Sequence, residues 1–159
     1  MSGIINSVNS KSGIIGRKPN TPFFAVLATG NQNGIANNTV TQLTSMSTVL
    51  KDTHGGWSSN AYYIPVGYSG TYQITGEFEF YSATNDMSVC NIQIWKNGAL
   101  ELERYSYVSY MGGYTYHDTR HFTCTIRHVD NAVGGTDRYD LRAYHYSNAS
   151  HTASAHNAQ

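Results

Sequence analysis

Residues Gly70–Tyr81 (GTYQITGEFEFY) constrain the fold more than any other part of the sequence. Their apolar and polar side chains alternate without interruption, apart from a glycine at position 76 on the apolar side. Successive side chains of a β-strand point to opposite faces, so this pattern predicts an antiparallel strand with one buried face. Gly76 predicts a bulge or a close approach of another element.

Three later segments repeat the alternation: residues 88–98 (SVCNIQIWKNG), 121–127 (HFTCTIR) and 137–144 (DRYDLRAY). The first ends in Asn97 and Gly98, which predict a hairpin turn. We expect Asn91, Gln93, Asp140 and Arg142 to lie on the faces away from the core. The predicted core is Tyr72, Ile74, Phe78, Phe80, Ile92, Ile94, Phe122, Ile126 and Leu141.

Further strand signals complete an all-β pattern. Residues 23–28 (FFAVLA) are typical of a buried strand, and residues 104–110 and 114–120 flank a glycine-containing turn. We count about eight to ten strands and no helix, and 13 of the 20 aromatic residues are tyrosine. Short strands with Gly-rich turns predict a sandwich, barrel or jelly roll. A chain of 159 residues suits one domain, here residues 23–159 behind an arm of residues 1–22.

Composition excludes several function classes. Only 13% of the residues are charged and the formal net charge is zero, which argues against nucleic-acid binding. No apolar run approaches the roughly 18 residues of a transmembrane helix, and the first residues lack the pattern of a secretory signal. Cys90 and Cys124 are too few for a disulfide framework; we expect buried thiols, with one bridge left open.

Catalytic and metal-binding constellations are weak. Cys124 is the best nucleophile, but on a strand His121 faces the opposite side, and His128 lies ~13 Å along the chain at ~3.3 Å per residue. His117 and His121 are separated by a similar length, too far to share one ion. We therefore predict a non-enzymatic protein without catalytic residues, cofactor or metal, while a metal held by three copies on a three-fold axis stays open.

Two sets of residues resemble a known family. The compact trimeric jelly roll of tumour necrosis factor and of complement globular heads has an aromatic residue, a proline and Gly-x-Tyr before a central strand, and a later aliphatic strand ending in Lys-Asn-Gly. The matching residues here are Tyr63, Pro65, Gly70, Tyr72, Ile74, Ile92, Ile94, Lys96, Asn97 and Gly98. The resemblance implies an antiparallel jelly-roll sandwich that assembles as a homotrimer.

The N-terminal arm contains the string SGII twice, at residues 2–5 and 12–15. It resembles the short arms that fasten small structural proteins to bacteriophage particles. That resemblance implies a virion protein made in the host bacterial cytoplasm, a head decoration or head-fibre knob bound to the major capsid protein or another virion protein. The implied anchoring residues are Ile4, Ile5, Val8, Ile14 and Ile15. The alternatives are a tail-fibre or receptor-binding protein and a secreted complement-like ligand.

A run of tyrosines forms the remaining candidate contact surface. Tyrosine gives rigid amphipathic area that suits both subunit interfaces and sugar rings. We expect packing or trimer contact for some of these residues and contact with host-surface glycans for others. The run consists of Tyr105, Tyr107, Tyr110, Tyr114 and Tyr116.

Overall fold

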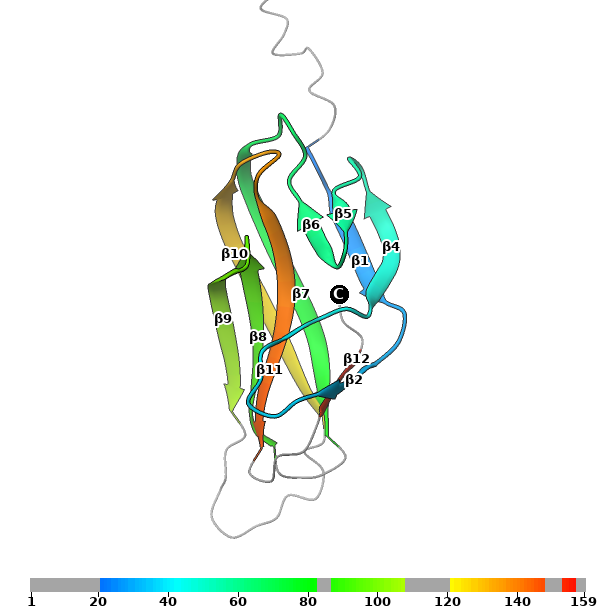
Figure 1. The fold of residues 1–159 in the computed structure, drawn as a ribbon, viewed down its shortest axis with the longest axis vertical. Coiled ribbons are helices and arrows are strands. Elements are labelled where there is room, and N and C mark those ends of the chain that lie inside the picture. Colours follow the sequence, from blue (N-terminus) through cyan, green and yellow to red (C-terminus); the bar gives the residue numbers. More distant parts are fainter. Residues whose placement is uncertain (1–20, 83–86, 108–120, 148–152, 157–159) are drawn as a thin grey trace, which may run out of the picture.

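The computed structural model describes residues 21–82, 87–107, 121–147 and 153–156, and all regular elements in these ranges are strands (Figure 1). The first six are β1 (Phe24–Ala28), β2 (Gln32–Ile35), β3 (Thr41–Gln42), β4 (Met46–Asp52), β5 (Trp57–Ser58) and β6 (Ala61–Tyr63). The others are β7 (Gly70–Tyr81), β8 (Met87–Lys96), β9 (Ala99–Tyr107), β10 (His121–Ala132), β11 (Arg138–Ser147) and β12 (Ala153–His156). The all-β prediction is confirmed.

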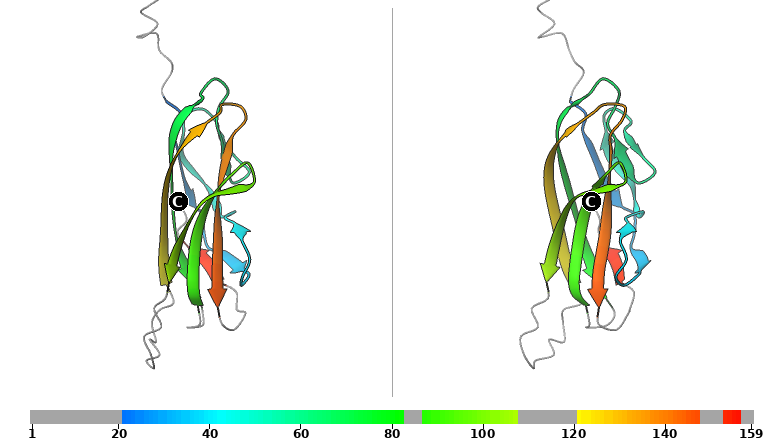
Figure 2. Two further views of the ribbon diagram at one scale, coloured as in Figure 1. Left: turned by 90° about the vertical axis from the view of Figure 1, so that its left-hand side faces the viewer. Right: turned by 60° about the vertical axis from the view of Figure 1, so that its left-hand side comes forward.

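The strands form two main antiparallel sheets. One has the order β10-β7-β12-β2, and the other has the order β5-β6-β11-β8-β9, with β3 also paired to β11. The long strands of both sheets follow the long axis of the molecule (Figures 1 and 2). Among the described strands, β1 and β4 pair only with each other, and they stand beside the rest of the sandwich.

The core lies between the two main sheets. Of the predicted core residues, Ile74, Phe78, Phe80, Ile92, Ile94, Ile126 and Leu141 are buried, whereas Tyr72 and Phe122 are partly buried and pack against this cluster. The rings of Phe78 and Phe80 meet edge to face, with centroids 4.7 Å apart. The Tyr72 hydroxyl donates to the Tyr68 carbonyl at 2.6 Å, so this side chain ends in a polar contact at the margin of the core.

Gly76 does not form a bulge, because β7 pairs with β10 in unbroken register from Gly70 to Tyr81. It permits a close approach instead. A Cβ atom at this position would lie 2.5 Å from Leu141 Cδ1 on the opposite sheet. The glycine therefore lets β7 and β11 pack tightly at the middle of the sandwich.

The structure differs from, or adds to, the sequence-based predictions for residues 23–28, for the two cysteines and for the hairpin of residues 104–120. Residues 23–28 are a less buried strand than predicted, since only Val26 is buried and the Phe23 side chain is largely exposed. That stretch borders an open groove described below. Cys90 and Cys124 are free thiols, and burial raises the pKa of both. The predicted hairpin of residues 104–120 lies mostly outside the described residues, beyond the end of β9.

Candidate ligand-binding surface

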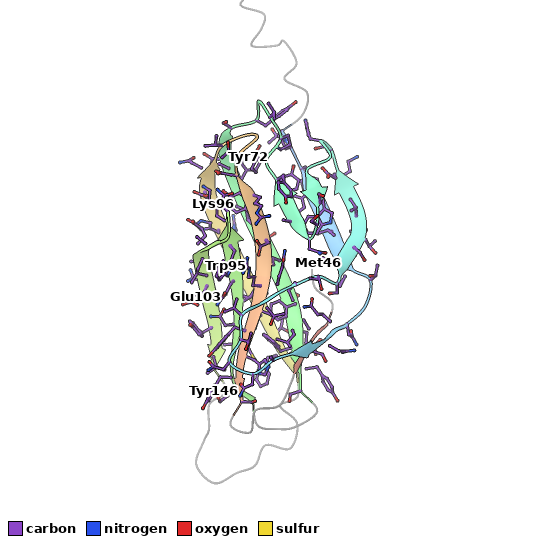
Figure 3. The ribbon with its side chains drawn as sticks, viewed as in Figure 1. Met46, Tyr72, Trp95, Lys96, Glu103 and Tyr146 are labelled. Atoms are coloured by element: carbon purple, nitrogen blue, oxygen red, sulfur yellow. The ribbon has the colours of Figure 1, made fainter. Side chains whose placement is uncertain are left out.

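The outward face of β8, β9 and β11 carries a layer of polar and aromatic side chains. The strand register places Asp140 beside Trp95, Arg142 beside Gln93, and Tyr144 beside Asn91. On the other side of β8, Gln93 lies opposite Glu103 and Asn91 lies opposite Tyr105. These eight residues form what we call the polar face; Figure 3 marks Trp95 and Glu103 along this side of the molecule.

Several members of the polar face are buried although they point away from the core. Asn91, Gln93 and Asp140 lie on the predicted faces, and their exposed fractions are only 0%, 4% and 4%. Alternation specifies the face on which a side chain lies and not what covers that face, so this burial is known only from the structure.

Glu103 is the centre of the hydrogen bonding on this face. Its Oε2 atom accepts from Asn91 Nδ2 at 3.1 Å, from Tyr105 Oη at 3.1 Å and from Gln93 Nε2 at 3.4 Å. Three donors from two strands hold the carboxylate in one orientation. A fixed carboxylate of this kind is ready to accept hydrogen bonds from a ligand without reorganising.

Trp95 and Arg142 form a second rigid unit next to Glu103. The Arg142 guanidinium lies 3.8 Å from the centroid of the Trp95 ring, and its Nε donates to Asp140 Oδ1 at 2.7 Å. The indole Nε1 donates to Gln93 Oε1 at 2.7 Å. Gln93 thus links the two units, since its amide nitrogen contacts Glu103. The face combines a fixed anion, a stacked cation and aromatic area.

Of the predicted tyrosine run, the structure places Tyr105 on the polar face, with 45% of its surface exposed and its hydroxyl on Glu103. Tyr107 ends β9, and its side chain is not among the described ones. Tyr110, Tyr114 and Tyr116 lie outside the described residues, as do the predicted anchoring residues Ile4, Ile5, Val8, Ile14 and Ile15. Sequence reasoning found Tyr105 and missed Glu103, Trp95 and Arg142, whose shared signal is their position across three paired strands.

A separate ion network lies on the inner side of the sheet, where β8 ends. Lys96 Nζ lies 2.6 Å from Asp130 Oδ2 and 3.2 Å from Asp137 Oδ2. Tyr139 Oη also donates to Asp130 at 2.6 Å, and Asn97 Nδ2 donates to Asp137 at 2.9 Å. These contacts tie β8, β10 and β11 together.

The pKa values of the network follow from its contacts. Burial alone would raise the pKa of Asp130, but hydrogen bonds from Lys96 and Tyr139 outweigh it and leave that pKa below its usual value. The backbone N–H of Val133, and then Asn97, lower the pKa of Asp137. Hydrogen bonding to Asp130 raises the pKa of Lys96. All three groups are therefore charged at neutral pH.

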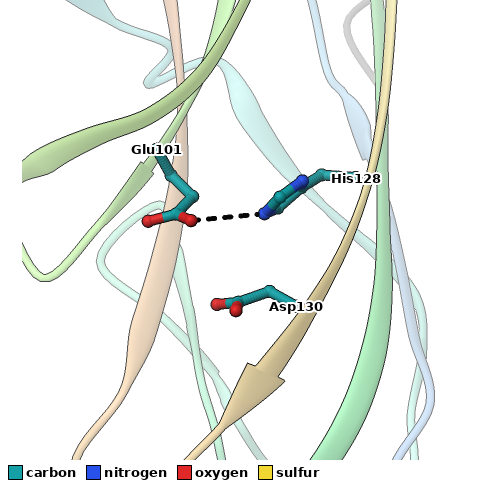
Figure 4. Close-up of side chains that lie close together, drawn as sticks. All are labelled: Glu101, His128 and Asp130. Carbon is teal, nitrogen blue, oxygen red and sulfur yellow. Dashed lines mark ion pairs between the residues drawn. The ribbon is translucent and has the colours of Figure 1, made fainter.

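Glu101, His128 and Asp130 bring possible metal-ligand atoms within 4.8 Å of one another (Figure 4). His128 Nε2 lies 3.4 Å from Glu101 Oε1. Glu101 reaches this position because it is the extra residue of a β-bulge: Ile94 pairs with Leu102, and Trp95 pairs with Leu100. Such a donor set is compatible with a divalent cation, but the ammonium of Lys96 already binds Asp130 and supplies positive charge beside the cluster.

Cys124, the best nucleophile candidate from the sequence, is a buried thiol in the structure. Its Sγ donates to Ser106 Oγ at 3.8 Å, and burial raises the pKa of the thiol, which disfavours the thiolate that a nucleophile requires. His128, the histidine on the same face as Cys124, contacts Glu101 rather than the thiol.

Within the described ranges, no helix is long and apolar enough to cross a membrane.

The sheet orders and the enclosed core define an antiparallel jelly-roll sandwich of the type found in tumour necrosis factor and complement globular heads. No family model and no curated protein matches the chain. Among solved structures, the globular domain of zebrafish complement 1qA protein aligns with a TM-score of 0.52 and 9% identity, covering 86% of this chain and 96% of that one. A second match, dimeric latent PorU from Porphyromonas gingivalis, has a TM-score of 0.30 and 6% identity, covering 83% of this chain and 13% of that one.

Proposed function

We propose that this protein is a non-enzymatic binding module that contacts its ligand through the polar face. The observation that carries the proposal is the hydrogen bonding of Glu103, which three side chains orient beside the exposed ring of Tyr105. Binding sites built from pre-oriented groups lose little entropy when a ligand arrives. The buried thiols, and the Glu101–His128–Asp130 cluster in which Lys96 already binds Asp130, offer no comparable arrangement for catalysis.

The chemistry of the polar face favours a polyhydroxylated ligand, such as a cell-surface glycan. A fixed carboxylate accepts hydrogen bonds from vicinal hydroxyl groups, and an exposed tyrosine ring covers the apolar side of a sugar.

The test is binding to a panel of immobilised glycans by the protein and by its Glu103→Ala and Tyr105→Ala variants. We expect Glu103→Ala to bind at least about tenfold more weakly, since a hydrogen bond to a charged group is worth about 1.5–3 kcal/mol. Tyr105→Ala should bind about two- to tenfold more weakly, since a stacked aromatic ring is worth about 0.5–1.5 kcal/mol. Thr123→Ala is the matched control, because Thr123 is exposed on β10, in the other sheet. Equal binding by all four proteins would remove the polar face from ligand recognition.

We further propose that the module assembles as a homotrimer. The support is the jelly-roll fold, which it shares with the globular domain of zebrafish complement 1qA protein. Light scattering coupled to size-exclusion chromatography is expected to give the mass of three chains, and a monomer at micromolar concentration would contradict the assembly.

The finer proposal is a bacteriophage virion role, as a head decoration or head-fibre knob bound by its arm to the major capsid protein or another virion protein. It is supported by the resemblance of the arm and its apolar residues, Ile4, Ile5 and Val8 among them. Protein gels of purified particles separate the alternatives: hundreds of copies indicate decoration, a handful indicates a tail fibre, and none contradicts the virion role. The last outcome leaves a secreted complement-like ligand, the reading closest to the structural match.

A further inference from the structure

An apolar groove opens between β1 and β7, on the side of the sandwich where the β1–β4 pair stands apart. It has a volume of about 650 Å³. Residues 24–27 of β1 form one wall and residues 73–77 of β7 form the other. Tyr62, Tyr139 and Leu141 from the second sheet contribute to the lining, so the groove reaches the core.

Both walls of the groove are strands that show one unpaired edge among the described residues. β7 pairs with β10 along its whole length, but on its other edge β12 covers only Glu79, Phe80 and Tyr81. β1 pairs with β4 alone. Alternate backbone N–H and C=O groups of a strand point toward each edge, so both walls direct hydrogen-bonding groups into the groove. An added strand would satisfy them on both sides.

The core is also less completely covered here than elsewhere. Val26, Ile74 and Leu141 line the groove and keep exposed fractions of 7%, 7% and 8%. Phe80, Ile92 and Ile94, away from the groove, are at 0%. Phe23 and Leu50, both largely exposed, are also part of the lining. One additional apolar strand in the groove would therefore cover these partly exposed side chains.

The chain carries a segment with the required properties directly before β1. Residues 12–17 (SGIIGR) contain two adjacent isoleucines flanked by glycines, and Lys18-Pro19-Asn20-Thr21 follows. Proline and asparagine at the two central positions favour a β-turn, and the residue before a proline favours an extended conformation. A reversal of the chain in this stretch would bring the preceding isoleucines to the groove beside β1.

We propose that the second SGII copy, residues 12–15, occupies this groove of its own chain as a strand between β1 and β7. The Phe23 carbonyl accepts from the backbone N–H of Thr53 at 3.0 Å and so points to the β4 side, which leaves the backbone groups of Phe24 facing the groove. The Phe24 ring points inward and stacks on Tyr62, with centroids 4.0 Å apart. Successive residues of a strand point to opposite faces, so one isoleucine of the Ile14–Ile15 pair enters the groove and the other covers its outer rim. The first copy stays available for a partner, so this inference does not depend on the proposed function.

Cysteine trapping in the full-length chain tests the position directly. Thr75 is exposed on the β7 wall, and the native Cys90 and Cys124 are buried and free. Ile14→Cys/Thr75→Cys and Ile15→Cys/Thr75→Cys are compared, and mild oxidation of one of these two variants is expected to give a disulfide within one chain, at least about tenfold faster than in the Ile5→Cys/Thr75→Cys control. A dimer on non-reducing gels would show that the arm enters a neighbouring copy and would overturn the proposal.

A second trap and a stability measurement complete the test. Preferential bonding in Ala158→Cys/Thr75→Cys would assign the groove to the residues after β12 and would also overturn it. Ile14→Asn/Ile15→Asn is expected to lower the melting temperature by about 5–10 °C, and Ile4→Asn/Ile5→Asn by less than about 1 °C. Equal shifts in the two variants would contradict a special role for the second copy. Glycan binding through the polar face is measured separately, so each proposal can fail without the other.

Discussion

Phe80→Ala is expected to lower the free energy of unfolding by about 3–5 kcal/mol, the usual cost of removing a fully buried aromatic ring. Phe80 has no exposed surface and lies on β7 between its partners Phe122 on β10 and Ala155 on β12. Its ring meets Phe78 edge to face and also contacts the ring of buried His145, at 5.9 Å between centroids. The cavity would thus open where three strands of one sheet meet the other sheet.

Urea unfolding at neutral pH, followed by intrinsic fluorescence, measures the change. Val129→Ala is the control, because Val129 lies on β10 but is largely exposed, and we expect it to cost less than about 0.5 kcal/mol. A loss below about 1 kcal/mol for Phe80→Ala would mean that the enclosed core between the two sheets is wrongly described.

Lys96→Met is expected to lower the free energy of unfolding by about 2 kcal/mol at pH 7 and by much less near pH 3. The substitution keeps the length of the side chain but leaves the carboxylates of Asp130 and Asp137 without their cation. Losing a partner from hydrogen bonds to charged groups costs about 1.5–3 kcal/mol, and Tyr139 and Asn97 continue to donate to the two carboxylates.

The pH dependence follows from the direction of each pKa shift. The pKa values of Asp130 and Asp137 are lowered by folding, so their stabilisation is present above the ordinary carboxyl pKa of about 4 and is lost as the pH falls through the folded values. The pKa of Lys96 is raised, so its contribution is complete below about pH 10 and is lost only in stronger alkali. The wild type and the variant should therefore differ most between about pH 5 and 9.

Lys51→Met is the matched control, since Lys51 is exposed on β4. Denaturant titrations at several pH values should show a constant, small effect for this variant. A Lys96→Met effect that does not shrink in acid would indicate that Lys96 acts through packing of its methylene groups rather than through the two carboxylates.

The sequence was informative about strands and about the face on which each side chain lies. Alternation around Ile74, Phe78 and Phe80 identified a half-buried strand that the structure confirms, because a period of two depends only on neighbouring residues. Asn97 and Gly98 identified a tight turn for the same local reason, and both have positive φ angles, 53° and 83°. Alternation did not show how far each face is covered: Asn91 and Gln93 lie on the predicted face and are buried.

The polar face could not be found in this way. Glu103, Gln93 and Arg142 come together only because β8 pairs with both β9 and β11 in one particular register. A shift of one residue in either pairing would send Glu103 or Arg142 to the other face of the sheet. The bulge at Glu101 has a similar effect, since one extra residue brings this carboxylate to His128. Such contacts depend on residues far apart in the sequence.

The sequence by itself determined that this chain forms short antiparallel strands around one apolar core, because alternation and turn residues act locally. Only the tertiary structure decided which strands are neighbours and which edges stay open. It paired β8 with β9 and β11, which assembles the polar face, and among the described residues it placed no strand between β1 and β7, where the groove opens. The physical reason is that strand pairing is selected by the packing of both sheets at once, a non-local property that no single segment encodes.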